Sequence, residues 1–369
     1  FIARDELKYG FDILGNRTNY EFYNSIGLKG SQIQNVTDLS GFLRYKRVAK
    51  QLVIEPGFRM NYYAALSEFS PEPRIGLKYN ITDRFRFKAA GGFYSQNLLA
   101  ATSERDIVNL FYGFLTGSDD LPSTFKGETL KSRLQKARHA IAGFEIDLPY
   151  HLELNIEGYI KDFNQLESVN RDKIFEDNSA NNDKPDYLKK DYIIETGLAK
   201  GADLTLKYDY RRLYVWAVYS YGYVTRTDEL RTYFPFFDRR HNANVVVAYK
   251  LGKKEQWEAN VRWNFGSPFP FTLTQGFYEQ LTFNNGLNTD VVHQNGQLGI
   301  YYDELNKGRL SYYHRLDASL RRIFKFSKNS TLDITASVTN VYDRDNIFYV
   351  NRVTGDRVRS EEHTSELQS

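Results

Sequence analysis

The chain has 369 residues and a formal net charge of +3 at pH 7, too close to neutral to argue for a nucleic-acid partner. It contains no cysteine, which excludes disulfides and thiolate chemistry. Aromatic residues make up 15% of the sequence, yet no apolar run approaches the roughly 18 residues of a membrane-spanning helix. Such a chain is expected to be either a large soluble β-protein or a membrane β-barrel, whose strands alternate between apolar and polar residues.

Apolar and polar residues alternate along most of the chain, which is the period of a β-strand with one apolar face. The stretch QWEANVRWNF contains two such sets: apolar Trp257, Ala259, Val261, Trp263 and Phe265, and polar Glu258, Asn260, Arg262 and Asn264. In a barrel, we expect the large members of the apolar set to face lipid. We expect the polar set to form a hydrated inner wall, together with Arg315, Asp317 and Arg321.

In chain order, the alternation predicts about thirteen strands. They lie near residues 5–15, 38–47, 51–62, 71–80, 84–95, 134–148, 151–166, 193–208, 213–226, 240–251, 256–266, 313–326 and 331–345. Strands of soluble proteins usually have about five or six residues, whereas a tilted strand that crosses a bilayer has about 9–11. The predicted lengths therefore favour a membrane barrel.

Two kinds of connection alternate between these strands. The short ones are rich in turn-forming residues and lie at 48–51, 80–83, 148–150, 209–212, 252–255 and 327–330. The long ones include 96–133, 167–191, 227–239 and 267–312. This alternation is typical of an all-β, antiparallel up-and-down transmembrane barrel with short periplasmic turns and long extracellular loops. A propeller is disfavoured, because its blades recur at a near-constant spacing and these hairpins do not.

Several stretches resemble the C-terminal barrel of TonB-dependent outer-membrane receptors: EPRIGLKYNITDRFRFKAAGGFYSQ (72–96), YIIETGLAKGADLTLKY (192–208), DRRHNANVVVAYKLG (238–252), WEANVRWNFGSPFPFTLTQGFYE (257–279) and residues 306–358. The resemblance implies a barrel of about 22 strands that holds an N-terminal plug in its lumen. It also implies contact with outer-membrane lipid in a Gram-negative bacterium, and energy supplied by the TonB complex.

Compared with that family, the chain is expected to be an incomplete barrel, with about 13 of 22 strands. It begins at Phe1, where we expect a cut rather than a natural terminus. It shows no plug, no TonB box and no closing strand, so we expect that this portion alone does not transport.

The last eleven residues, RSEEHTSELQS, contain no aromatic residue and one large aliphatic residue, Leu367. They resemble the in-frame translation of a sequencing-library adapter. We therefore predict two segments, a partial receptor barrel at 1–358 and an adapter-derived tail at 359–369 that is not part of the fold. A genuine polar C-terminal tail is the alternative. Under the adapter interpretation, the Glu-Glu-His sequence in the tail is not a metal site.

The sequence has no G-x-S-x-G, H-E-x-x-H, Walker A or zinc-binding spacing. We therefore expect no enzymatic activity, no cofactor and no metal centre. The acidic loop FEDNSANNDKPD, at 175–186, has oxygen ligands suited to Ca²⁺. Its spacing does not match an EF-hand, which favours a solvated loop.

Aromatic residues and arginines gather in two long loops, at 232–241 and 266–279. Aromatic faces stack on rings, and arginines hold anionic groups. The ligand-contact candidates are Tyr233, Phe234, Phe236, Phe237, Arg239, Arg240, Phe269, Phe271, Phe277 and Tyr278. An aromatic girdle at the membrane interface and self-packing of the loops are the alternatives. His241 and His314 each begin a strand, and we favour interfacial, hydrogen-bonded side chains over pH sensors or ligand contacts.

The resemblance implies a parent protein that imports a scarce, bulky ligand by energised transport. Siderophores, oligosaccharides, peptides and cobalamin all fit. A passive outer-membrane porin or adhesin barrel is the first alternative, and it would lack a plug and a TonB box. A soluble carbohydrate-binding β-protein is the second, and it would express without detergent and bind glycan.

Overall fold

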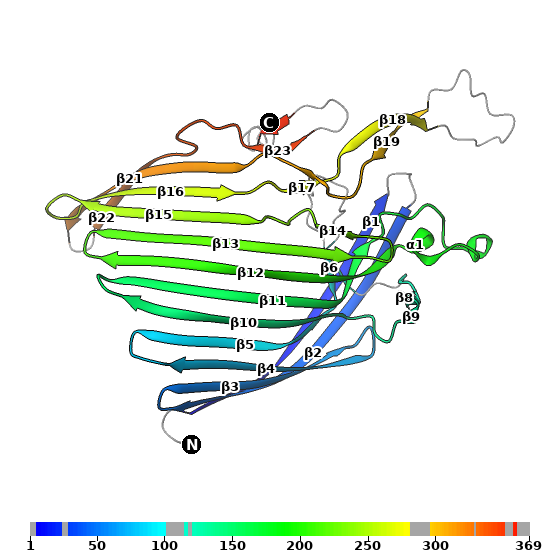
Figure 1. The fold of residues 1–369 in the computed structure, drawn as a ribbon, viewed down its shortest axis with the longest axis horizontal. Coiled ribbons are helices and arrows are strands. Elements are labelled where there is room, and N and C mark those ends of the chain that lie inside the picture. Colours follow the sequence, from blue (N-terminus) through cyan, green and yellow to red (C-terminus); the bar gives the residue numbers. More distant parts are fainter. Residues whose placement is uncertain are drawn as a thin grey trace.

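The computed structural model describes residues 5–23, 29–100, 114–116, 120–280, 296–327, 330–350 and 357–359. The long strands form one antiparallel sheet in which each strand pairs with its neighbours along the chain (Figure 1). The row consists of β1 (Glu6–Tyr23), β2 (Lys29–Ala49), β3 (Leu52–Tyr63), β4 (Glu68–Asn80), β5 (Phe85–Gln96), β10 (Gln135–Leu148), β11 (Leu152–Val169), β12 (Tyr192–Tyr210), β13 (Leu213–Thr227), β15 (His241–Leu251), β16 (Trp257–Gly266), β21 (Tyr313–Ser327) and β22 (Ser330–Val338). The sheet has 14 strands, 13 in the row and β14 (Thr232–Tyr233) paired with β13 beside it. The predicted up-and-down meander and its number of long strands are confirmed.

The connections divide the sheet into two rims. Short turns join the strands at one end, on the left of Figure 1, which we call the short-turn rim. Loops with small elements join them at the other end, the long-loop rim. These elements are β6 (Leu98–Ala100), β7 (Phe114–Thr116), β8 (Thr124–Phe125), β9 (Glu128–Thr129), η1 (Ser179–Asn181), α1 (Asp186–Lys189), β14, β17 (Pro270–Phe271), β18 (Thr274–Gln280), β19 (Gln297–Tyr302) and β20 (Gly308–Arg309). A hairpin of β23 (Ile347–Val350) and β24 (Arg357–Arg359) follows β22. No helix in the described ranges is both long and apolar enough to cross a membrane.

The tight turns contain backbone positions in the left-handed region. Lys50 (φ 53°) and Arg211 (φ 55°) each begin a two-residue connection between strands. Gly252 (φ 89°) begins the longer turn between β15 and β16. Hairpin turns that follow the twist of the flanking strands use positive φ, so these positions let the chain reverse at once.

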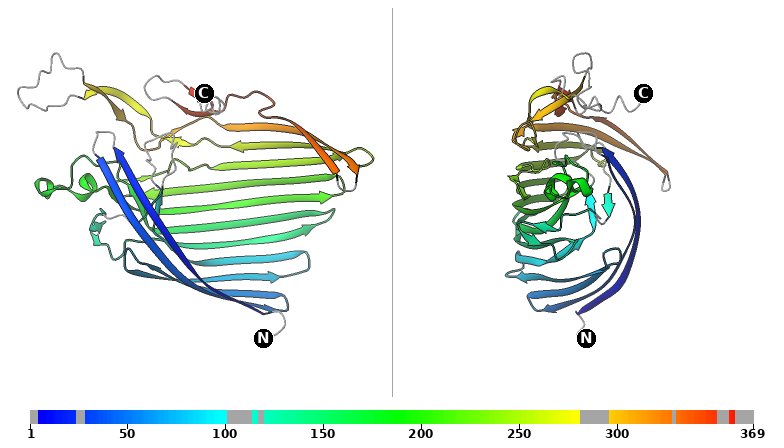
Figure 2. Two further views of the ribbon diagram at one scale, coloured as in Figure 1. Left: turned by 180° about the vertical axis from the view of Figure 1, so that it is seen from behind. Right: turned by 90° about the vertical axis from the view of Figure 1, so that its right-hand side faces the viewer.

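Figure 2 shows that the sheet curls into an open trough. β1 and β22 form its two edges, and no pairing joins them in the part of the chain that the structure describes. The sheet is therefore an unclosed barrel, as predicted, and each edge strand keeps unpaired backbone groups.

The strand register sorts the side chains onto the two faces of the sheet. Val261 of β16 lies opposite Val247 of β15 and Ala318 of β21, whereas the next residue, Arg262, lies opposite Asp317. Because side chains alternate along a strand, one face is apolar and the other polar, as predicted. The apolar face leaves many large side chains exposed, among them Ile75, Leu204, Val261, Leu320 and Ile334.

The polar face lines the inside of the trough. Glu55, Lys78, Lys88 and Glu157 line a groove there. Lys78 lies 3.0 Å from Glu145, and Lys88 lies 3.3 Å from Glu157. In each pair one strand lies between the two partners, so opposite charges on next-but-one strands compensate one another along this wall.

A single row of strands has no second layer to pack against, so the buried core is small. Leu99 and Tyr192 form its centre, and Leu121 and Val169 pack against them. All four lie at the long-loop rim, where loops cover the ends of β11 and β12. The fold therefore concentrates its buried side chains where the long loops meet.

The last predicted strand, 331–345, is too long, because β22 ends at Val338. Asn340 turns the chain, with a φ of 53°. Its backbone N–H donates to Asp317 at 3.0 Å, and its side chain accepts from the Arg344 N–H at 3.1 Å. These local bonds replace the ladder that would have continued the strand. Arg359, the first residue of the predicted tail, belongs to β24, and 360–369 lie outside the described residues.

Candidate functional site

The loops after β11, β13 and β16 meet at the long-loop rim, where two clusters of side chains lie. The first, which we call the Arg171 network, consists of Ser168, Arg171, Asp172, Glu195, Arg226, Asp228, Arg231 and Tyr233. The second, which we call the Arg239 cluster, consists of Tyr223, Phe234, Asp238, Arg239, Arg240, Ser267, Phe269, Arg309 and Tyr313.

Arg171 lies at the centre of its network, with 2% of its side chain exposed. Its Nη1 donates to Glu195 Oε1 at 2.9 Å, and its Nη2 donates to Asp228. The Tyr233 hydroxyl donates to the same Glu195 oxygen at 2.8 Å, and its ring lies 4.6 Å from the guanidinium. Since a buried charge is costly unless it is paired, these bonds hold the loop after β11 to β12 and to the loop after β13.

The charges of the Arg171 network balance. Arg226 lies 3.5 Å from Glu195, and Arg231 lies 2.6 Å from Asp172. Three arginines therefore face three carboxylates. Burial opposes the charged form of Arg171, but these neighbours outweigh burial and raise its pKa. The network has no charge left over for a ligand, so we interpret it as structural.

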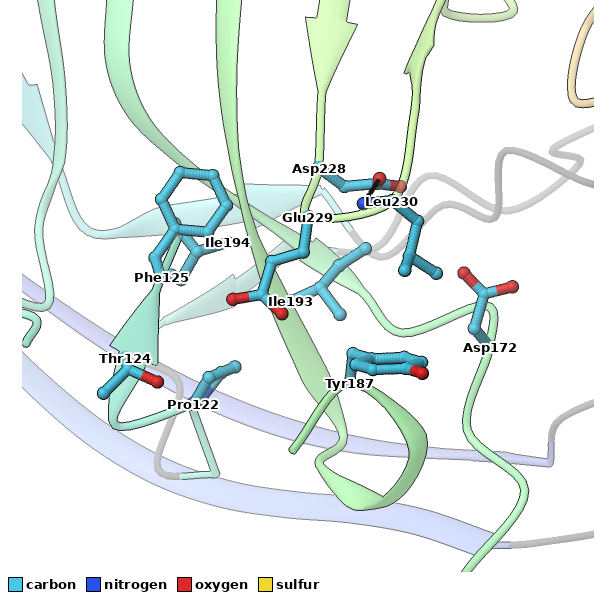
Figure 3. Close-up of a pocket in the computed structure, with 10 residues that line it drawn as sticks. All are labelled: Pro122, Thr124, Phe125, Asp172, Tyr187, Ile193, Ile194, Asp228, Glu229 and Leu230. Carbon is cyan, nitrogen blue, oxygen red and sulfur yellow. Dashed lines mark hydrogen bonds between the residues drawn. The ribbon is translucent and has the colours of Figure 1, made fainter. Parts of the chain in front are cut away.

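A small pocket lies beside the Arg171 network (Figure 3). Phe125 of β8 and Ile193 and Ile194 of β12 give it an apolar wall, and Asp172 and Asp228 also line it. Its volume of about 20 Å³ has room for about one water molecule. The pocket is therefore too small for a bulky ligand.

Asp238 organises the second cluster, and none of its side chain is exposed. Its Oδ2 lies 3.1 Å from Arg240 and 3.2 Å from Arg309, and its Oδ1 accepts from the Val224 N–H at 3.0 Å. The Arg240 guanidinium also lies 3.9 Å from the centre of the Tyr223 ring. Arg240 therefore has a carboxylate partner within the protein, which it shares with Arg309.

Arg239 has a different environment. Its guanidinium lies 4.1 Å from the ring centre of Phe269 and 5.5 Å from that of Tyr313, and its Nε donates to the Ser267 carbonyl at 3.0 Å. No carboxylate pairs with it among the described residues, and burial lowers its pKa. A Cβ on Gly266 would come within 2.1 Å of the guanidinium carbon, so this packing requires glycine there.

Arg239 is thus a cation partly removed from water, and no carboxylate of the described structure pairs with it, since the adjacent Asp238 pairs with Arg240 and Arg309. An anionic group on a ligand can make the charge-assisted hydrogen bonds that the protein leaves unused. Phe269 is 37% exposed and presents an aromatic surface beside the cation. The pair therefore suits a ligand with an anionic group and a ring.

Five of the predicted ligand-contact residues lie in the two clusters: Tyr233, Phe234, Arg239, Arg240 and Phe269. Tyr233 is buried in the Arg171 network, and Phe234 packs 4.6 Å from the Arg240 guanidinium. Loop self-packing therefore occupies these three side chains. Ligand contact stays a prediction for all five. Among them, Arg239 is the arginine without a carboxylate partner in the described ranges, and Phe269 keeps an exposed ring.

The other five candidates are not members of these clusters, although the Phe237 ring centre lies 5.4 Å from the Arg226 guanidinium. Phe236 and Phe237 pack edge to face, with ring centres 5.3 Å apart. Phe271 lies in β17, which pairs with β20. Phe277 and Tyr278 lie on the β18–β19 hairpin, which projects beyond the rim in Figure 1. For these five, ligand contact likewise stays a prediction.

Several central residues carry no recognisable sequence pattern, because their partners are far away along the chain. Arg171 and Asp228 are 57 residues apart, and Asp238 and Arg309 are 71 apart. No local motif marks such pairs. The sequence around Glu195 gives a weak indication of a buried ion pair. Glu195 follows an apolar run at the start of a strand, and a carboxylate buried there needs a partner.

The acidic loop at 175–186 is held by lysine–carboxylate pairs. Lys190 Nζ lies 2.5 Å from Asp177 and 2.7 Å from Asp120. The hydrogen bond from Lys190 holds the pKa of Asp177 below its usual value. Across the described ranges, no group of three side chains is arranged to hold a metal ion.

The two histidines at the long-loop ends of strands are each paired with a tyrosine. His241 Nδ1 lies 2.7 Å from the Tyr219 hydroxyl, and His314 Nδ1 lies 2.7 Å from the Tyr342 hydroxyl. These contacts match the expectation of hydrogen-bonded side chains near the rim.

Comparison with known proteins gives the fold. No protein-family model matches the sequence, and no curated protein matches it. The chain is similar to Pseudomonas aeruginosa FpvA bound to a pyoverdine–iron complex, at 13% identity and a TM-score of 0.59, over 97% of this chain and 45% of that one.

Two further structures agree. The outer membrane transporter YddB from Escherichia coli has 12% identity and a TM-score of 0.57, over 96% of this chain and 49% of that one. The ferric enterobactin receptor PfeA from Pseudomonas aeruginosa has 14% identity and a TM-score of 0.58, over 93% of this chain and 47% of that one. The chain therefore has the fold of part of an outer-membrane receptor barrel, and it spans less than half the length of these proteins.

Proposed function

We propose that the chain is the barrel portion of a TonB-dependent receptor in the outer membrane of a Gram-negative bacterium. The observation that carries the proposal is an open, antiparallel barrel that matches solved outer-membrane receptors over at least 93% of this chain. The exposed apolar face supports it, because barrels are how β-strands satisfy their backbone groups inside a bilayer.

In this proposal, the short turns lie on the periplasmic side and the long loops lie outside the cell. The polar face then lines the lumen, where the plug of the parent protein would sit. The compensated pairs Lys78–Glu145 and Lys88–Glu157 suit a hydrated wall against such a plug. The TonB complex would supply the energy, and the proposal assigns the chain no enzymatic activity.

The parent protein is proposed to import a scarce, bulky ligand that carries an anionic group. Two residues support this choice: Arg239, which has no carboxylate partner among the described residues, and Phe269, whose ring is exposed. Two proteins similar in fold are a receptor bound to a pyoverdine–iron complex and a ferric enterobactin receptor. A ferric siderophore is therefore the first ligand to test, before oligosaccharides, peptides and cobalamin.

The first test is to recover the complete gene from its source and read across both ends of this chain. We expect a TonB box and a plug upstream, and a closing strand in place of residues 359–369. A complete gene that encodes no plug would instead make the protein a passive porin or adhesin barrel.

A second test separates membrane and soluble forms. After expression in Escherichia coli with an export signal, the barrel should float with outer-membrane vesicles in a sucrose gradient. Recovery without detergent, together with glycan binding, would support a soluble carbohydrate-binding protein and overturn the proposal.

A further inference from the structure

One cation interrupts the apolar outward face of β16, β21 and β22 near the short-turn rim. β16, β21 and β22 lie wholly within the described ranges, and their outward positions contain a single Arg, Lys, Asp or Glu. It is Arg322 of β21, which lies opposite Trp257 of β16 and Ile334 of β22. An unpaired charge among lipid-facing side chains is costly, so its surroundings need an explanation.

Two aromatic rings flank Arg322 on this face. Its guanidinium carbon lies 4.6 Å from the ring centre of Trp257 and 4.4 Å from that of Phe324. Its Nε is buried and has no hydrogen-bond partner among the described residues. The preceding residue, Arg321, points to the polar face and pairs with Asp333. Arg322 is thus oriented by rings but left without an anion.

The height of Arg322 in the sheet suggests which anion it meets. Trp257 is the first residue of β16, so Arg322 lies about level with the end of the strand at the short-turn rim. Tryptophan is enriched where acyl chains meet headgroups, and arginine extends its charge toward that level. The turn before Trp257 adds two exposed cations, Lys253 and Lys254.

We propose that Arg322 binds the phosphate of a phospholipid in the leaflet that borders the short turns. The planar guanidinium matches a phosphate, while Trp257 and Phe324 contact the upper part of the acyl chains. Positive charge at the rim complements the anionic headgroup, and the apolar outward side chains of β16, β21 and β22 complement the acyl chains of the lipid. This inference rests on the proposed function, because it requires the outward face to lie in a bilayer.

The test uses the full chain in maltoside micelles, titrated with phosphatidylglycerol that carries bromine on its acyl chains. Bromine quenches nearby tryptophan, and Trp257→Phe identifies the part of the signal that reports this site. Arg322→Gln should weaken phosphatidylglycerol binding about five-fold, the effect of about 1 kcal/mol per arginine near a membrane surface. Arg321→Gln, on the opposite face, should leave binding unchanged.

Two further arms identify the ligand. A brominated galactolipid, which has no phosphate, should bind the unmodified chain about as weakly as phosphatidylglycerol binds Arg322→Gln. Arg322→Lys keeps the charge and should retain most of the affinity. If millimolar inorganic phosphate abolished the higher affinity for phosphatidylglycerol over the galactolipid, the site would bind free phosphate and the inference would be overturned.

The remaining outcomes separate this inference from the proposed function. Equal phosphatidylglycerol binding by the unmodified chain and Arg322→Gln would overturn the phosphate site and leave the membrane barrel intact. Absence of quenching by every brominated lipid would overturn both, because the outward face would then not contact acyl chains.

Discussion

Arg171 and Arg239 are two arginines at the same rim with opposite electrostatic roles. Arg171 is almost fully buried and is neutralised by Glu195 and Asp228. Arg239 is held by aromatic rings and a carbonyl, with no carboxylate in the described surroundings. The first arrangement rigidifies loops, whereas the second leaves a charge for a partner, because only an uncompensated cation gains from meeting an anion.

Glu195→Gln should destabilise the barrel strongly. The neutral amide would leave the buried charge of Arg171 undercompensated, and breaking such a pair costs about 3–5 kcal/mol. Urea unfolding in lipid vesicles measures the change. The matched control is Glu153→Gln, whose carboxylate is 62% exposed and lies 3.6 Å from Lys207. That surface pair should contribute less than about 1 kcal/mol, so equal losses in both variants would contradict the assignment.

Arg239→Gln in the complete receptor should lower affinity for an anionic ligand about ten-fold, the effect of one charge-assisted hydrogen bond of about 1.5 kcal/mol. Gly266→Ala should reproduce part of this loss, because the added Cβ would displace the guanidinium. Ligand titration on purified receptor measures both. Arg212→Gln, at the short-turn rim, is the control, and unchanged binding by Arg239→Gln would remove Arg239 from the binding site.

At the scale of elements, the alternation of apolar and polar residues predicts the strands and their order correctly. Every predicted long strand corresponds to one strand of the row, because each apolar face must stay on one side of a continuous sheet. The predicted strand ends are wrong where backbone pairing continues beyond the alternation of apolar and polar residues. β1 and β2 have 18 and 21 residues, longer than the predicted 5–15 and 38–47, because their backbones pair with each other from Glu6–Lys46 to Tyr23–Lys29.

Val261→Arg tests the outward face of β16. An arginine there should destabilise the barrel by about 2–4 kcal/mol if the position lies at the middle of the bilayer. Asn260→Arg, one residue earlier on the polar face, should have little effect. Unfolding titrations in vesicles compare the two variants, and a negligible cost for Val261→Arg would mean that the face or depth is wrong.

Acidification should loosen the loop that carries η1 and α1. Lys190 lowers the pKa of Asp177 from its ordinary value of 3.8, so the folded state holds this carboxylate ionised more firmly than the unfolded state does. Its contribution is therefore complete above about pH 4 and is lost as pH falls through the lowered pKa. Protection factors from hydrogen exchange, which correct for the lower intrinsic exchange rate in acid, should fall in residues 171–191 between pH 5 and pH 3.

Asp177→Asn is the control for this acid response. At pH 5 its loop should be less protected from exchange than the loop of the unmodified chain. The further loss of protection between pH 5 and pH 3 should be smaller. An unchanged acid response in Asp177→Asn would assign the effect to other carboxylates.

At the scale of the whole molecule, the trough ends in two open edges. β1 and β22 each present unpaired backbone groups, which readily pair with another chain. We expect the isolated chain to associate in detergent at micromolar concentration, as measured by light scattering. A complete receptor that supplies the missing strands should remain monomeric under the same conditions, and a monomeric isolated chain would contradict this account of the edges.

The sequence by itself determined the class of fold, the order of the strands, the faces of the sheet and the alternation of short and long connections. These properties follow from local periodicity and turn chemistry, which each segment carries on its own. Only the tertiary structure decided which loop residues meet. It paired Arg171 with Asp228 and Asp238 with Arg309, and it gave Arg239 and Arg322 no carboxylate partner within the described ranges. Charge compensation depends on distances between segments far apart in the chain, and the curl of the sheet and the packing of its loops set those distances.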